Sequence, residues 1–120
     1  MSDTTFLDWP FFEQRHRQLA IDLEQWAKTN LVDINHEDID SACKELVSKF
    51  ASAGWLNYSA PAPDTKDTKP FDVRSLCIIR ETLAYHSGLA DFSFAMQGLG
   101  SGPITLYGNE KTKSNILPEV

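Results

Sequence analysis

The sequence predicts an all-α protein, an orthogonal or up-down helical bundle of about five or six helices. Apolar residues recur at the three-, four- and seven-residue spacings of helices over most of the chain. No segment of useful length alternates apolar and polar residues, as a half-buried strand would. Gly54, Gly108 and Pro118 each follow such a periodic segment, where they would end a helix.

The length, net charge and cysteine content of the chain limit the classes of protein to which it can belong. A chain of 120 residues can bury one core, so we expect a single domain over 1–120. The net charge is −6 and the basic residues are scattered, which argues against nucleic acid as a partner. The first fifteen residues lack a basic region followed by an apolar stretch, and nothing approaches 18 consecutive apolar residues, so we expect no signal peptide, no membrane insertion and a cytoplasmic location. Cys43 and Cys77 form no C-x-x-C motif and are predicted to be reduced, buried thiols.

The first helix is expected from about Trp9 or Pro10 to Asn30, with Asp8 as its N-cap and Glu24 on its solvent side. One face of this helix carries an apolar stripe, which consists of Phe12, Leu19, Leu23, Trp26 and Ala27. This stripe predicts the side that packs on the core.

The second helix is expected from about His36 to Ser52, capped by Asn35 and ended by Gly54. Its apolar stripe consists of Ile39, Cys43, Leu46 and Phe50. Trp55 and Leu56 are predicted to fold back onto the core. Residues 57–70, which contain three prolines, are expected to form a surface loop.

A long third helix is expected from Val73 to Gln97, with Asp72 as its N-cap. Its last turns are small and apolar all round, which predicts a segment buried on every side. Gly88 lies inside this predicted helix, so close packing is expected there.

Three glycines follow, in "GLGSG" at residues 98–102. They fit neither the dinucleotide-binding nor the P-loop spacing. We interpret them as a helix end, with Gly98 or Gly100 at C′ and Ser101 as the next N-cap. Two short helices should follow, at about 103–107 and 110–117.

The sequence offers no catalytic, cofactor-binding or metal-binding constellation. The histidines at positions 16, 36 and 86 lie in three separate segments. Glu81, next to Arg80 in the long helix, is interpreted as a solvated or paired charge rather than a catalytic base.

The last fifty residues carry a resemblance. The segment 74–120 contains "RETLA" at 80–84, the glycine corner at 98–104 and "YGNEKTK" followed by "LP" within 107–118. It resembles the end of the N-terminal helical domain of the acyl-CoA dehydrogenase family. Residues 9–56 fit the first two helices of that domain less specifically.

The resemblance implies the N-terminal domain of a longer three-domain flavoenzyme that oxidises an acyl-CoA thioester between its α and β carbons. The family's FAD is held largely by a β-domain, and its catalytic carboxylate also lies outside this chain. The 120-residue chain alone is therefore expected to bind no FAD and to be inactive. The full-length enzyme is expected to use FAD and to form a homotetramer.

Carried over by position, four residues would face the acyl group of the substrate: Phe92, Ala95, Met96 and Leu99. Phe92 would narrow the space and Ala95 would open it, which suggests a short, branched or cyclic acyl group. Two alternatives stay open. These residues could pack against other domains, or the chain could be a stand-alone helical interaction module without the chemistry. Apolar faces left uncovered would make the isolated chain a homo-oligomer.

Overall fold

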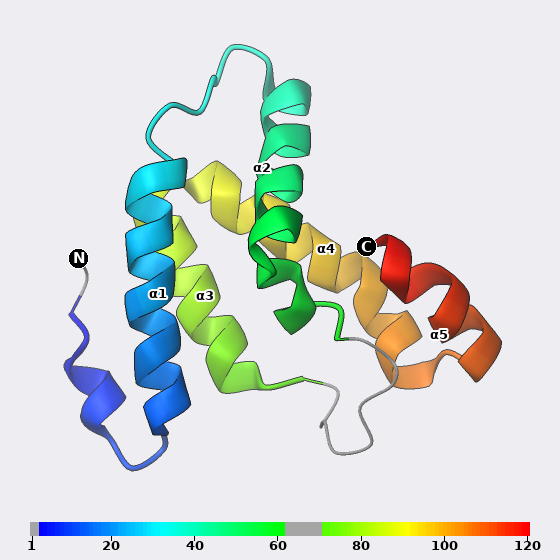
Figure 1. Cartoon of the computed structure of the whole chain (residues 1–120), viewed down its shortest axis with the longest axis horizontal. Coiled ribbons are helices and arrows are strands. Elements are labelled where there is room, and N and C mark those ends of the chain that lie inside the picture. The colour runs from blue at the N-terminus through cyan, green and yellow to red at the C-terminus, as the bar shows by residue number, and fades with distance from the viewer. Residues whose placement is uncertain (1–2, 62–70) are drawn as a thin grey trace.

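The computed structural model describes residues 3–61 and 71–120, and every regular element among them is a helix (Figure 1). This confirms the predicted all-α class. The α-helices, in order, are α1 (Gln14–Asn30), α2 (Ile39–Ala53), α3 (Val73–His86), α4 (Gly88–Tyr107) and α5 (Glu110–Ile116). Three short 3-10 helices accompany them: η1 (Thr5–Asp8), η2 (Trp55–Tyr58) and η3 (Leu117–Glu119).

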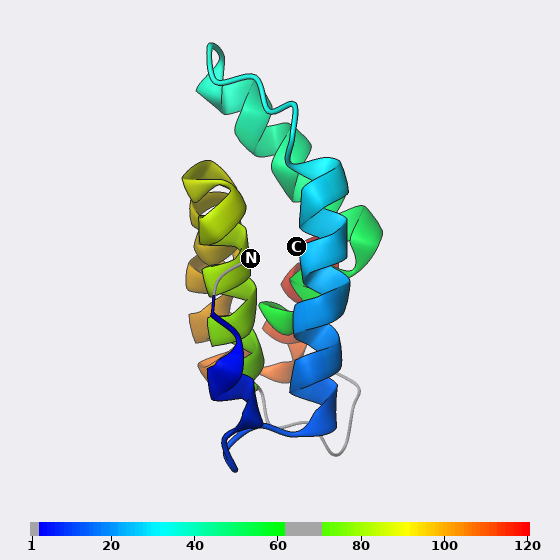
Figure 2. The ribbon, with the colours of Figure 1, turned by 90° about the vertical axis from the view of Figure 1, so that its left-hand side faces the viewer.

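The helices form a flattened bundle with extents of 42 × 40 × 19 Å. α1 and α3 run side by side in the same direction (Figure 2), while α2 crosses α4 on the side seen in Figure 1. α5 and η3 pack against the far end of α4. Along the described ranges, no helix combines the length and the apolar character that crossing a bilayer requires.

α1 begins later than predicted, at Gln14 instead of Trp9 or Pro10. Asp8 belongs to η1, so its predicted role as N-cap is wrong. Glu13 is the N-cap, and its side chain accepts a hydrogen bond from the backbone of His16. The His16 ring in turn accepts the Glu13 backbone N–H at 2.9 Å. This reciprocal pair fixes where the helix starts, and it uses a histidine where the usual motif has Glu or Gln.

α2 begins at Ile39 and not at His36, because Asp38 rather than Asn35 caps it. The Asp38 carboxylate accepts the Ser41 backbone N–H at 3.1 Å. Gly54 ends the helix with φ of +79°, as predicted, in the left-handed region that favours glycine. The chain then folds back as expected, and Leu56 is buried.

The predicted long third helix is broken at Ser87. This residue is extended, with φ −158° and ψ 115°, and its hydroxyl accepts the Ala90 backbone N–H at 3.2 Å. Serine is a favoured N-cap residue because its hydroxyl can accept a backbone N–H at the start of a helix. The spacing of apolar residues does not reveal such a cap. Gly88 is therefore the first residue of α4, and no atom of another described segment lies within 4 Å of a Cβ placed there, so the predicted close packing is wrong. Asp72 caps α3 as predicted.

α4 continues through the three glycines and Pro103 to Tyr107, so the predicted helix end at Gly98 or Gly100 is wrong. The predicted helix at 103–107 is the last part of α4. Ser101 is not an N-cap, since its hydroxyl donates to the Gln97 carbonyl at 2.8 Å within the helix. Gly108 follows the last residue of α4, and α5 matches its expected range closely.

The core is centred where α1, α2, α3 and α4 meet. Phe50 of α2 is fully buried and packs edge-to-face on Phe94 of α4, with ring centroids 5.9 Å apart. Its other aromatic neighbour is Trp26, at 5.6 Å. The prediction of two buried thiols is wrong, because Cys43 is half-buried and Cys77 is exposed. Most of the predicted loop at 57–70 lies outside the described residues, and its first two residues belong to η2.

Candidate ligand-binding groove

The four predicted site residues lie together on one groove between α3 and α4. Phe92, Ala95, Met96 and Leu99 all line it, because spacings of three, four and seven place them on one face of α4. The groove has a volume of about 520 Å³, within the usual range for ligand sites. The structure thus brings these residues together, and their role toward a substrate stays a prediction.

The groove face of α4 is apolar but uncovered. Phe92 is 59% exposed, Met96 42% and Leu99 69%, so the prediction of a segment buried on every side is wrong. The face turned away from the groove is buried and includes Ala90 and Ser93. Large apolar side chains gathered on one exposed face mark a surface that a ligand or another protein segment covers.

The second wall of the groove comes from α3 and the segment before it. Val73 and Leu76 of α3 and Phe71 line this wall, so most of the lining is apolar. Phe94 also lines the groove and is 1% exposed, because it packs beneath on Phe50 of α2. The groove floor is therefore part of the hydrophobic core, which makes it rigid.

The segment directly after η2 contributes to the groove near Gly98. Ser59, directly after η2, lines the groove, and its Cβ lies 3.3 Å from where a Cβ on Gly98 would be. The Ser101 hydroxyl, which donates to Gln97 within α4, also lies 3.3 Å from the Ser59 carbonyl. Glycine at position 98 thus permits a close approach that any side chain would disturb.

An ion pair lies at the end of the groove nearest the α3–α4 junction. Arg80 of α3 binds the Asp91 carboxylate through Nε and Nη2, both at 2.8 Å. This hydrogen-bonded carboxylate raises the pKa of the Arg80 guanidinium. Among the described residues that line the groove, Arg80 is the only charged one. Glu81, its neighbour in sequence, is exposed and lies outside the groove, in agreement with its interpretation as a solvated charge.

One histidine–carboxylate pair fixes the start of α3 against α1. His16 is fully buried, and its Nε2 lies 2.9 Å from Asp72. Because Nδ1 accepts the Glu13 N–H, Nε2 must carry the hydrogen and donate it to the carboxylate. Burial raises the pKa of Asp72, but hydrogen bonds from His16 and Ser75 outweigh it and lower that pKa to about 2.

A second pair fixes the end of α3. His86 Nε2 lies 2.9 Å from Glu24, and Lys28 lies 3.2 Å from the other oxygen of that carboxylate. The His86 hydrogen bond lowers the pKa of Glu24 against the effect of burial, with help from Lys28. Glu24 was predicted on the solvent side, but its side chain is only 8% exposed. The four-residue spacing of Glu24 and Lys28 can be read from the sequence. The pairing of Glu24 with His86, 62 residues away, cannot.

The described residues hold no group of three His, Cys, Asp or Glu side chains that could bind a metal ion. His16 and His86 are taken up by the two pairs, and His36 is exposed before α2. What the arrangement offers chemically is an apolar surface on a rigid floor, with one neutralised ion pair at its edge.

The comparison with protein families agrees with the fold. The sequence model of the acyl-CoA dehydrogenase N-terminal domain matches residues 13–120. No curated protein sequence matches the chain significantly. The matched range includes every residue of the groove.

Proposed function

The chain belongs to the acyl-CoA dehydrogenase family through its N-terminal domain, and we propose that it lines the acyl-group pocket of a FAD-dependent acyl-CoA dehydrogenase. The observation that carries this proposal is the groove face of α4. Phe92, Ala95, Met96 and Leu99 stand on one uncovered apolar surface of the size that ligands need.

The work of this surface is binding and the exclusion of water. An acyl tail gains free energy as its apolar surface leaves water, roughly 0.8 kcal/mol for each buried methylene. Met96 is flexible enough to adjust to the shape of the tail. The reaction removes hydrogen from the α and β carbons of the thioester, and a tail held in the groove would fix where those carbons lie.

The groove does not fit FAD itself. A dinucleotide carries a pyrophosphate, which calls for free cationic groups or backbone N–H groups at a helix start. Arg80, the one cation lining the groove among the described residues, is already held by Asp91. We therefore assign the flavin to another part of the full-length enzyme, and we assign the catalytic base there too because no carboxylate lines the groove among the described residues.

The remaining parts of the proposal concern the whole protein. We propose that residues 1–120 act as one domain beside a flavin-binding β-domain and a C-terminal helical bundle, in a cytoplasmic homotetramer. The 120-residue chain alone would be inactive. Its exposed Phe92, Met96 and Leu99 would drive it to self-associate, which light scattering on the isolated chain would test.

The first experiment is to express the complete reading frame that encodes this chain and to record its mass and absorption spectrum. A yellow protein whose flavin is bleached by an acyl-CoA supports the proposal. A colourless 120-residue product that no acyl-CoA affects overturns it, and favours a helical interaction module.

The pocket role has its own test, Ala95→Leu in the full-length protein. The added side chain enters the groove, so we expect KM for acyl-CoA to rise about tenfold. Ala84→Leu is the matched control, since Ala84 is an exposed helical alanine outside the groove. Equal KM values for the two variants would contradict the assignment of Ala95.

A further inference from the structure

The segment before α1 folds back over the helices as a strap, which consists of residues 3–12. It contains η1, and Figure 2 shows it lying over α3 before it joins the start of α1. Leu7 of the strap is buried in the same core cluster as Leu19 and Leu23 of α1. The family match begins at residue 13, so the strap lies outside the matched range.

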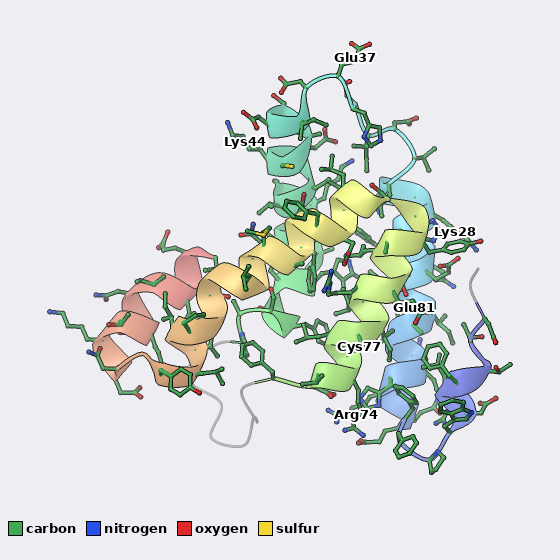
Figure 3. All side chains as sticks on the ribbon, turned by 180° about the vertical axis from the view of Figure 1, so that it is seen from behind. Lys28, Glu37, Lys44, Arg74, Cys77 and Glu81 are labelled. Carbon is green, nitrogen blue, oxygen red and sulfur yellow. The ribbon has the colours of Figure 1, made fainter. Side chains whose placement is uncertain are left out.

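Two side chains hold the strap where it enters α1. Arg74, labelled in Figure 3 at the start of α3, donates to the Phe11 carbonyl at 2.7 Å and to the Glu13 carboxylate at 3.0 Å. His16 accepts the Glu13 backbone N–H through Nδ1 at 2.9 Å, and its ring packs edge-to-face on that of Phe12. An arginine stays charged at any pH near neutrality, whereas an imidazole can gain or lose its charge there.

The Nδ1 lone pair of His16 can hold either the strap or a proton. Because Nε2 donates to Asp72 at 2.9 Å, Nδ1 is the one acceptor of the neutral ring, and the Glu13 N–H uses it. A proton on Nδ1 would turn this acceptor into a second donor that faces the Glu13 N–H. The hydrogen bond to Asp72 would remain, because a charged imidazole still donates through Nε2. Protonation therefore breaks the contact with the strap and leaves the contact with α3 in place.

The charged groups around His16 show which group can titrate near neutral pH. They come from each element packed there: Glu13 and Arg15 at the start of α1, Asp72 and Arg74 at the start of α3, Tyr58 of η2, which interacts with Arg15, and Asp8 of the strap, which faces Arg17. Against the effect of burial, hydrogen bonds lower the pKa of Asp72 to about 2. The hydrogen bond from Arg15 lowers the pKa of Glu13. Both carboxylates thus stay charged between about pH 5 and 8, where a histidine can change its charge.

We propose that the strap is an acid-sensitive element, which opens from α1 and α3 when His16 takes up a proton at Nδ1. The closed strap requires Nδ1 to be unprotonated and the open strap does not, so acidification favours the open form. A single competing proton that binds in the range usual for histidine should raise the open population about tenfold from about pH 7.5 to about pH 5.5. The strap forms one wall of a hollow of about 300 Å³, to which α1 contributes Ala20 and α3 contributes Thr82. Opening would widen this hollow.

Hydrogen exchange on the full-length protein, followed by mass spectrometry, tests the proposal. The backbone N–H groups of Leu7, Trp9 and Phe12 are hydrogen-bonded within the strap, so their protection reports its closure. Their protection factors, corrected for the pH dependence of exchange itself, should fall about tenfold between the two pH values. The protection of the buried turn of α2 around Phe50 should not change.

His16→Gln is the variant that removes the proton and keeps the hydrogen bonds. Glutamine carries an acceptor and a donor on one amide, is a usual residue at this place in a capping box, and takes up no proton in this range. Its strap should be equally protected at both pH values. His36→Gln is the matched control, because His36 is exposed and lies outside this contact. It should show the same fall as the unmodified protein.

The outcomes decide the proposal without a flavin or an acyl-CoA. A fall that is confined to the strap and abolished by His16→Gln supports it. Equal strap protection at the two pH values in the unmodified protein overturns it, whether or not the variant folds. A fall that persists in His16→Gln also overturns it, because another group would then carry the pH dependence. If the glutamine variant does not fold, His16→Asn replaces it with the same expectation.

Discussion

The α1–α3 interface and the α3–α4 groove share one helix but differ in what covers their apolar side chains. At the interface, Leu23 and Ile79 are fully buried, and a histidine–carboxylate pair closes each end. In the groove, Met96 and Leu99 stay exposed on a floor that is itself core. The difference teaches that the apolar side chains on one side of α3 stabilise the bundle, whereas those on the other side are left uncovered by the described residues.

The largest effect should come from exchanging leucine for alanine on the two sides. Leu23→Ala should lower the free energy of unfolding by about 2–5 kcal/mol, because a fully buried side chain leaves a cavity. Leu99→Ala, at an exposed position, should change it by less than about 0.5 kcal/mol. Urea denaturation of both variants measures this. A similar loss for Leu99→Ala would mean that the groove is already filled by the fold.

The next effect depends on pH and acts at the interface alone. Folding lowers the pKa of Asp72 from 3.8 to about 2. Because the folded-state pKa is the lower one, the stabilisation is complete above about pH 4 and is lost as the pH falls toward 2. The loss should be on the order of 2 kcal/mol.

Acid titration of the unfolding free energy tests this, with Asp72→Asn as the comparison. The asparagine variant should be less stable near neutral pH and should lack this part of the acid dependence. An acid profile that is identical in the two proteins would place the sensitivity elsewhere, for example at Glu24, whose pKa is also lowered.

The helices of the bundle could be predicted because they depend on local spacing. The stripe that contains Leu19, Leu23 and Ala27 is buried as expected, and Gly54 ends α2 as glycine does. The break at Ser87 could not be predicted this way, because the apolar pattern continues across it. The break lies at Ser87 because its side-chain hydroxyl caps the helix that follows.

The groove was only partly predictable, for a related reason. Its α4 residues are neighbours on one helix face. A resemblance that assigns one of them to the groove therefore assigns the others to it as well. Its second wall depends on how α3 folds back beside α4, and the Arg80–Asp91 pair joins residues on two helices that the sequence suggested were one. The pairs His16–Asp72 and Glu24–His86 join residues more than fifty positions apart, and nothing in their local sequence indicates them.

The smallest effect should separate two glycines of α4. Gly100→Ala should raise the free energy of unfolding by about 0.4–1 kcal/mol, since alanine restricts the unfolded chain and no atom of another described segment lies within 4 Å of its Cβ. Gly98→Ala should bring no gain, because its Cβ would lie 3.3 Å from that of Ser59, which would have to move. Thermal unfolding of the two variants compares them directly. If Gly98→Ala were stabilised as much as Gly100→Ala, Ser59 would move freely, and the approach of Ser59 to Gly98 would not be fixed by the fold.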